Sequence, residues 1–219
     1  MTLLRQFFTE MPIIAILRGL TPEEAPAALD ALTEAGIRTL EVPLNSPRPF
    51  ESLRILVERG GKDLLIGAGT VLSPEEAVQV AEIGARLIVA PNVDPTVIAK
   101  ACTLGLAALP GVATPSEALA ALKAGASGLK MFPGEMLPPK VLKAWRAVLP
   151  ADTLLVPVGG VTIDVITAYW NSGAAAFGIG SALYQPGLAS DALRDRARAL
   201  VEHCRGLVGS ASQDIRRGR

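Results

Sequence analysis

Short apolar runs alternate with longer mixed segments along the chain. Each run spans three to five residues rich in Ile, Leu, Val and Ala, which is the pattern of a strand buried on both faces. The segments between the runs have the spacing of amphipathic helices. The eight runs lie at residues 13–17, 39–42, 64–68, 87–89, 106–109, 128–132, 154–158 and 175–179.

Helix-start signals support this division. A capping residue, a first-turn proline and acidic residues follow one another at residues 21–24 (TPEE) and 73–76 (SPEE), and residues 114–117 (TPSE) repeat the pattern. Glycine follows several helical segments, for example at Gly36 and Gly84, as it does at helix ends. Strands that alternate with helices predict right-handed βαβ units and a parallel sheet.

Eight such units predict a single α/β domain, a (β/α)8 TIM barrel, at residues 1–206. Residues 3–8 are expected to form a short helix that closes the amino-terminal end of the barrel, and residues 207–219 a flexible polar and basic tail. An open doubly wound sheet would also alternate strands and helices, but it typically has a glycine-rich turn after its first strand. Arg18 and Gly19 stand there instead.

Composition agrees with this fold and disfavours several classes of function. Half of the 219 residues are hydrophobic and only 4% are aromatic, so aliphatic side chains must build the core. The 21 basic and 21 acidic residues give zero net charge, so we expect neither a nucleic-acid nor a membrane partner. No apolar stretch reaches the length of a membrane span and residues 1–10 lack signal-peptide features, which predicts a cytoplasmic protein.

The chain offers few histidine and cysteine ligands for a metal. Cys102 and Cys204 are far apart and fit no metal motif, and His203 is the single histidine. We therefore expect no metal, no cofactor and no Ser–His–Asp triad.

Lys130 is the most informative polar residue. It lies inside the apolar run at residues 128–132, whereas the other five lysines lie in loops or on polar helical faces. Burial disfavours the charged ammonium, so it lowers the pKa of a lysine and frees the amine to attack a carbonyl. The alternative is a lysine at a strand end whose ammonium reaches water. This segment alone leaves both interpretations open.

Glu41 is a second ionisable residue within an apolar run. A buried carboxylate has a perturbed pKa and can act as a general acid or base, or it can form a structural ion pair, for instance with Arg18 or Lys130. The active site of a TIM barrel lies at the carboxyl ends of its strands. Glu41 and Lys130 are expected on that same rim, which favours the acid/base role.

Glycines follow the last two predicted strands, at Gly159-Gly160 and at Gly180-Ser181. Barrels often bind phosphate there through backbone N–H groups, although a Gly-Gly pair is often only a turn. Arg18 would pair with a phosphate or a carboxylate. An amine nucleophile, a carboxyl acid/base and a phosphate site without metal ligands suggest a class I aldolase.

Six segments resemble, in the same order, the 2-keto-3-deoxy-6-phosphogluconate/galactonate (KDPG/KDPGal) aldolases. The resemblance extends over about residues 10–205, and the combination of segments is more specific than any one of them. The segments are residues 13–19 (IIAILRG), 41–47 (EVPLNSP), 66–72 (IGAGTVL), 110–112 (PGV), 129–133 (LKMFP) and 158–161 (VGGV).

The resemblance implies a homotrimeric carbon–carbon lyase of sugar-acid degradation. Such an enzyme reversibly cleaves a 6-phosphorylated 2-keto-3-deoxy sugar acid to pyruvate and glyceraldehyde 3-phosphate. Lys130 matches the Schiff-base lysine and Glu41 the general acid/base. The positions that match substrate contacts are Arg18, Thr70, Pro91, Phe132, Gly159, Gly160, Gly180 and Ser181, with Thr70 near the pyruvyl carboxylate.

Two further positions resemble the galactonate branch of the family. Asn45 stands four residues after Glu41, where gluconate-type enzymes usually have Arg, and Val158 stands where they more often have Thr. The two substrates differ at the C4 hydroxyl, so an apolar side chain in place of a hydrogen-bonding one would favour one epimer. The sequence leaves open whether the enzyme acts on both epimers.

Two other classes of function remain as alternatives. One is a barrel isomerase or synthase that binds a sugar phosphate without covalent catalysis. The other is a catalytically inactive barrel that serves as a binding module. The presence of Lys130, Glu41 and the glycine loops together argues against the inactive barrel.

Overall fold

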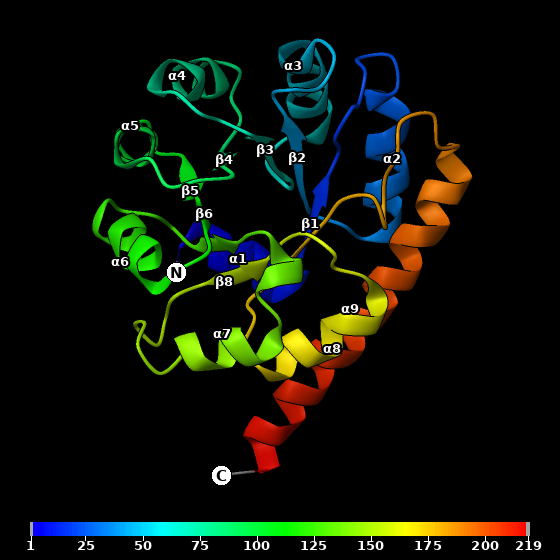
Figure 1. The fold of residues 1–219 in the computed structure, drawn as a ribbon. Helices are drawn as coiled ribbons and strands as arrows, with labels where there is room; N and C mark the ends of the chain where they lie inside the picture. The colour runs from blue at the N-terminus through cyan, green and yellow to red at the C-terminus, as the bar shows by residue number, and fades with distance from the viewer. Residues whose placement is uncertain (1, 218–219) are drawn as a thin grey trace.

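Parallel strands lie at the centre of the molecule and helices surround them (Figure 1). The structure, a computed structural model, describes residues 2–217, with the backbone alone for residues 210–217. The described strands are β1 (Ile13–Ile16), β2 (Thr39–Pro43), β3 (Leu65–Gly69), β4 (Leu87–Val89), β5 (Ala107–Leu109), β6 (Gly111–Val112), β7 (Leu129–Met131), β8 (Leu155–Pro157) and β9 (Phe177–Ile179).

Each helix from α2 to α9 follows a strand, as the alternating pattern predicts. The helix starts predicted at Ser73 and Thr114 are confirmed, and each has a capping box. The helix predicted from residue 21 begins only at Ala25, after a turn. The helices are α1 (Leu3–Glu10), α2 (Ala25–Ala35), α3 (Pro49–Gly60), α4 (Pro74–Glu82), α5 (Pro95–Thr103), α6 (Pro115–Lys123), α7 (Pro139–Trp145), α8 (Ile163–Asn171), α9 (Ser190–Arg217) and the short 3-10 helix η1 (Gly134–Met136).

The strands form two parallel sheets. One has the order β5-β4-β3-β2-β1-β9 and the other β6-β7-β8. All eight predicted runs contain a strand, so the prediction of a parallel α/β fold is confirmed. The prediction of eight strands in one barrel is met only in part, because the run at residues 106–109 continues past Pro110 as β6. Proline has no N–H to donate, which interrupts the ladder there.

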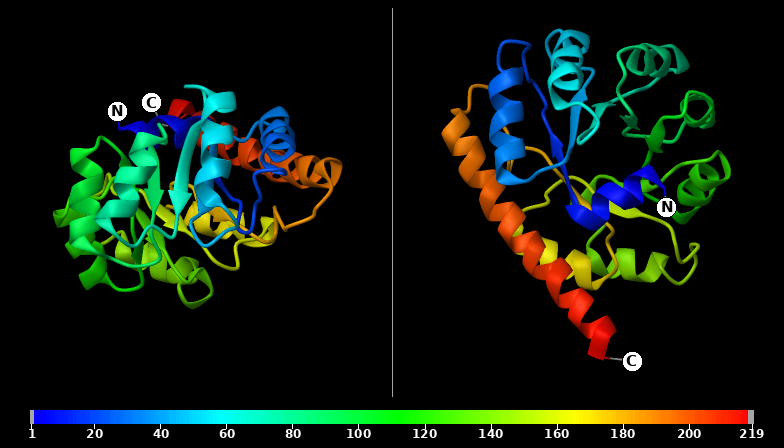
Figure 2. Two further views of the ribbon diagram at one scale, coloured as in Figure 1. Left: turned by 90° about the horizontal axis from the view of Figure 1, so that it is seen from above. Right: turned by 180° about the vertical axis from the view of Figure 1, so that it is seen from behind.

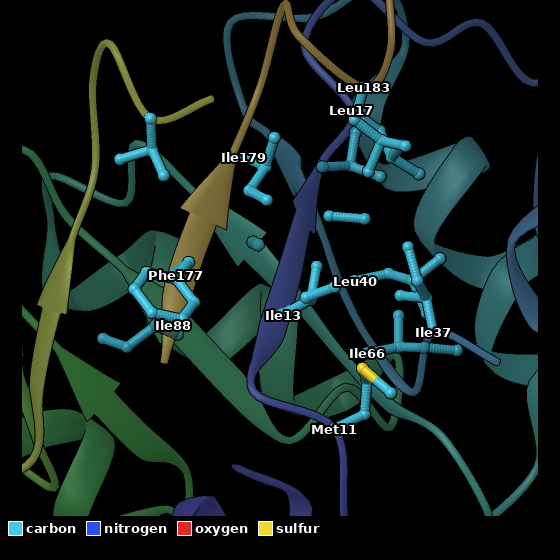
Figure 3. Packing of buried hydrophobic residues seen from close by; sticks show 14 of the residues in the cluster. Met11, Ile13, Leu17, Ile37, Leu40, Ile66, Ile88, Phe177, Ile179 and Leu183 are labelled. Carbon is cyan, nitrogen blue, oxygen red and sulfur yellow. The ribbon is translucent and has the colours of Figure 1, made fainter. Parts of the chain in front are cut away.

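Aliphatic side chains alternate between two apolar layers along the strands. Ile13, Leu40 and Ile66 belong to the larger layer, between the strands and the surrounding helices (Figure 3). Ile14 and Leu65 belong to the inner layer, where they pack with the buried side chains of α1. The short helix predicted at residues 3–8 is thus confirmed as α1, and Figure 2 shows it across the amino ends of the strands.

Helix α9 is longer than the sequence predicts. It packs on α2 and α8 and continues as a helix to Arg217, through the first eleven residues of the tail predicted at 207–219 (Figures 1 and 2). Gly206 and Gly209 weaken a helix by only about 1 kcal/mol each relative to alanine, so they do not end it. Residues 218 and 219 lie outside the described residues, and the flexibility of this end stays a prediction.

None of the helices in the described part of the chain is both long and apolar enough to span a bilayer.

Thr39 provides a test of the inner layer. It faces Ile14 and Leu65 across the ladder, and its buried Oγ1 has no hydrogen-bond partner in the described residues. Burying an unpaired hydroxyl costs about 1–3 kcal/mol. We therefore expect Thr39→Val, which replaces the hydroxyl by a methyl of similar size, to raise the free energy of unfolding in urea by about 1–2 kcal/mol. Thr39→Ser as a control should not raise it, and a destabilised Val variant would contradict this account.

Candidate active site

A cavity of about 240 Å³ opens at the carboxyl ends of five strands. Its walls come from β1, β2, β7, β8 and β9 and from the loops that follow them, so residues from both sheets meet there. The predicted site residues that line it are Arg18, Glu41, Lys130, Phe132, Val158, Gly159, Gly160, Gly180 and Ser181. The sequence thus identified most of the polar wall of this cavity.

Glu41 and Lys130 are the two buried charged residues among the side chains that the structure describes. Glu41 is 2% exposed and Lys130 is 6% exposed. Glu41 lies on β2 opposite Ile16 and Gly67, and Lys130 lies on β7 opposite Gly111 and Val156. Both side chains line the same cavity.

The carboxyl group of Glu41 occupies space that a glycine leaves on the next strand. A Cβ atom at Gly69 on β3 would overlap the Glu41 carboxyl group. A larger residue at this position would displace the carboxyl from its place in the cavity. Glu41 Oε2 is buried and accepts no hydrogen bond within the described residues.

Burial controls the charge state of this carboxyl group. Loss of water contact raises the pKa of Glu41 to about 7, although the positive charges of Lys130 and Arg18 pull it down. A carboxyl with this pKa can both accept and release a proton near neutral pH, which is what a general acid/base requires.

The same environment acts on Lys130 in the opposite direction. Desolvation lowers the pKa of its ammonium, the charge of Glu41 raises it, and the charge of Arg18 lowers it again. The net effect is a pKa below the ordinary value for lysine, which increases the fraction of neutral, nucleophilic amine. The Lys130 Nζ lies 4.4 Å from the centre of the Phe132 ring, which forms part of the cavity wall.

The loop after β8 has a backbone that only glycine adopts easily. Gly159 and Gly160 have φ values of 100° and 63°, in the left-handed region. The Glu135 side chain also lies over this turn, since its Oε2 is 2.6 Å from the position of a Cβ on Gly159. Glycine at these two positions therefore leaves room for the Glu135 side chain against the turn.

Arg18 and Asn45 are joined at the mouth of the cavity. Both are exposed, and Arg18 Nη1 donates a hydrogen bond of 2.7 Å to Asn45 Oδ1. Asn45 does not line the cavity itself. It therefore contacts the cavity only through the guanidinium of Arg18.

Two other predicted site residues lie outside the cavity lining. Thr70 follows β3 and Pro91 follows soon after β4, so both are at the carboxyl ends of the strands but not in the wall. Thr70 has a φ of 55°, which is uncommon for a residue other than glycine.

Several residues in the wall were not found from the sequence. Glu135 had the clearest signal, because an acidic residue follows the Lys130 strand within one short loop. Thr162 stands between the Gly159-Gly160 turn and α8, which is a common place for a ligand-binding hydroxyl. The full set that was missed is Ile16, Glu135, Val161, Thr162, Gly178 and Ala182.

A larger cleft, of about 860 Å³, lies at the opposite end of the strands. It is formed by α1, α2 and the residues that precede β2 and β3. Its Asp30 and Arg59 pair with each other at 3.0 Å, and both are about half exposed. The smaller cavity is the better candidate for chemistry, because it contains the buried and perturbed pair Glu41 and Lys130.

Comparison with known proteins agrees with this choice. A family model described as KDPG and KHG aldolase matches residues 4–199. A Rhizobium meliloti protein named probable 2-dehydro-3-deoxy-6-phosphogalactonate aldolase is 50% identical over 192 residues, which are 88% of this chain and 91% of the relative. An Escherichia coli protein named 2-dehydro-3-deoxy-6-phosphogalactonate aldolase is 43% identical over 203 residues, 93% of this chain and 99% of the relative.

A solved structure described as native KDPGal is also similar. It superimposes with a TM-score of 0.89 at 43% sequence identity, over 91% of this chain and 97% of that chain. The family model and these relatives cover nearly the whole described chain, including every strand that carries a wall residue. The chain therefore belongs to the KDPG and KHG aldolase family.

Proposed function

We propose that this chain is a class I aldolase that reversibly cleaves 2-dehydro-3-deoxy-6-phosphogalactonate to pyruvate and D-glyceraldehyde 3-phosphate. The observation that carries this proposal is that Lys130 and Glu41, the two buried charged residues among the described side chains, face one cavity. The names of the two relatives support the substrate.

Lys130 is the nucleophile of the proposed reaction. Its neutral amine attacks the C2 ketone of the substrate, and loss of water from the carbinolamine leaves an iminium ion. The iminium then accepts the electron pair of the C3–C4 bond as that bond breaks. The products of this step are an enamine of pyruvate on Lys130 and the free aldehyde. The low pKa of Lys130 favours the first attack.

Glu41 moves the protons of this reaction, directly or through one water. As a carboxylate it accepts the proton of the C4 hydroxyl when the C3–C4 bond breaks. As a carboxylic acid it then returns a proton to C3 of the enamine, and hydrolysis of the resulting iminium releases pyruvate. A pKa of about 7 suits a group that must act in both directions.

The substrate phosphate is placed at the other end of the cavity in this proposal. Gly159, Gly160, Gly180 and Ser181 line the cavity, where their N–H groups can donate to the phosphate, and the guanidinium of Arg18 supplies positive charge. Thr70 and Pro91 lie at the carboxyl ends of β3 and β4 and are assigned to the carboxylate end of the bound substrate.

We further infer that the two sheets form one closed (β/α)8 barrel that works as a cytoplasmic homotrimer. Contacts between the sheets support the closure: Ser127 N donates to Ala108 O at 2.9 Å, and Val158 bridges to Gly178. Pro110 then interrupts one continuous strand made of β5 and β6. The trimer and the compartment rest on the family resemblance.

The runner-up is a sugar-phosphate isomerase or synthase that uses the same cavity without a covalent step. It would need no amine of lowered pKa, so the burial of Lys130 disfavours it.

The first prediction separates covalent from non-covalent catalysis. In wild-type protein, borohydride in the presence of pyruvate should add the mass of reduced pyruvate to Lys130, as found by peptide mass spectrometry. Lys130→Ala should remove both the added mass and all turnover of the phosphorylated keto-acid. Lys140→Ala, at an exposed lysine on α7, is the control and should change neither. Turnover without trapping would support the isomerase or synthase. The absence of both turnover and trapping would support an inactive barrel.

The second prediction concerns Glu41. Cleavage by the wild-type enzyme should slow about tenfold per pH unit below pH 7, because the carboxyl group becomes protonated and no longer accepts the C4 proton. In Glu41→Gln this dependence should disappear and exchange of the pyruvate C3 protons should slow by at least about a hundredfold. Trapping on Lys130 should persist. Wild-type exchange rates in the variant would refute the role of Glu41.

The third prediction concerns the C4 epimers. Val158 presents an apolar wall to the cavity. We expect kcat/KM to favour the galactonate epimer over 2-dehydro-3-deoxy-6-phosphogluconate, measured side by side. Val158→Thr adds a hydroxyl and should shift that ratio about tenfold toward the gluconate epimer. Val156→Thr, two residues earlier in the chain and fully buried in β8, is the matched control. A ratio unchanged by Val158→Thr would exclude this position as the determinant.

A further inference from the structure

Two loops that are distant in the sequence meet beside the cavity. The loop after β1 carries Arg18 and the loop after β9 carries Gly180 and Ser181, all of which line the wall. A Cβ on Gly19 would lie 2.7 Å from Cγ of Pro186, so the two loops are in close contact.

Buried apolar side chains lie at the bases of both loops. Leu17 and Leu183, one from each loop, are fully buried and belong to the same apolar cluster. They lie near each other in the close-up of Figure 3. The relative position of the loops is therefore fixed by packing at their bases.

The carboxylate of Glu24 joins the loops at the surface. Its Oε2 accepts hydrogen bonds from Thr21 N at 3.1 Å and Thr21 Oγ1 at 3.0 Å, within its own loop. The same oxygen accepts one from Tyr184 Oη at 3.3 Å, and Oε1 accepts one from Gly187 N at 2.9 Å, both in the loop after β9. One side chain thus ties residues that are about 160 positions apart.

Tyr184 is part of the same turn as the wall residues. The carbonyl of Gly180 accepts hydrogen bonds from Leu183 N at 2.8 Å and from Tyr184 N at 2.9 Å. Gln185 Nε2 donates to the carbonyl of Ser181 at 3.3 Å. A shift of Tyr184 would therefore also move the backbone of Gly180 and Ser181.

The protonation states of Glu24 and Tyr184 favour the hydrogen bond between them. Burial by itself would raise the pKa of Glu24, but the hydrogen bonds from Gly187 N and Thr21 outweigh it and hold that pKa below its usual value. Burial and the neighbouring Glu24 charge raise the pKa of Tyr184, which keeps its hydroxyl protonated as a donor.

We infer that Glu24 is a positioning residue for the phosphate of the substrate, because it holds the Gly180-Ser181 turn against the loop of Arg18. Glu24 is not in the cavity wall, so it acts through these two loops and touches no substrate atom. This inference rests on the proposed function. It requires that loss of Glu24 affects the phosphate end of the substrate and leaves the chemistry at Lys130 unchanged.

The test is the kinetics of Glu24→Gln. The glutamine amide can accept with one oxygen only, and its NH2 group faces donors. We expect KM for the phosphorylated keto-acid to rise about tenfold, which is the loss of one hydrogen bond to a charged group, while kcat stays within about twofold. The inhibition constant of glycerol 3-phosphate should rise by the same factor. Exchange of the pyruvate C3 protons, which involves no phosphate, should be unchanged.

Two further variants sharpen the result. Tyr184→Phe removes one donor to Glu24 and should raise the same KM about threefold. Glu23→Gln is the matched control: this neighbouring side chain is 66% exposed and pairs with Arg48, away from the β9 loop. It should leave KM and the glycerol 3-phosphate constant at wild-type values.

Three outcomes would overturn the inference: an unchanged KM in Glu24→Gln, a loss of kcat at constant KM, or an equal loss of pyruvate exchange. The last would indicate a general structural role. Failure of the proposed function is a separate result, because it would appear in the wild-type enzyme as no trapping on Lys130 and no cleavage.

Discussion

The fold keeps one carboxyl group and one amine out of water inside an aliphatic interior, and the active-site geometry follows from this constraint. Such burial is unfavourable for both charged forms. The mutual attraction of Glu41 and Lys130 offsets only part of it, since Glu41 Oε2 accepts no hydrogen bond within the described residues. The pKa of Glu41 is consequently raised to about 7, and the pKa of Lys130 lies below its ordinary value. The apolar packing between the strands and the helices, α1 included, offsets the unfavourable free energy of burying these two groups.

The strand pattern was largely predictable because eight of the nine described strands overlap aliphatic runs that the sequence reveals. The errors lie where a local rule competes with packing. Pro110 separates β5 from β6. Whether a proline interrupts the ladder depends on which neighbouring strand would have accepted a hydrogen bond from its missing N–H. Gly206 and Gly209 indicate a helix end, but each weakens a helix only slightly, and α9 continues past both. The break at Pro110 could not be derived without its tertiary neighbours.

The candidate site was predictable to the extent that polar residues interrupt apolar strands. Glu41 and Lys130 are conspicuous for this reason, and the glycines after β8 and β9 mark the loops beside them. Glu135 and Thr162 do not interrupt an apolar strand, so their sequence signals are weaker than those of Glu41 and Lys130, although both line the cavity. The same holds for Glu24, whose hydrogen bonds to the β9 loop connect positions that no local pattern relates.

The overlap between the Glu41 carboxyl group and the space beside Gly69 has an evolutionary consequence. The two positions share one volume, so neither can change freely while the other is kept. A side chain gained at residue 69 would be tolerated only with a shorter acid at residue 41, and the intermediate single variants would be inferior to both end states. The residue at position 69 of β3 is thus coupled by volume to the residue at position 41 of β2.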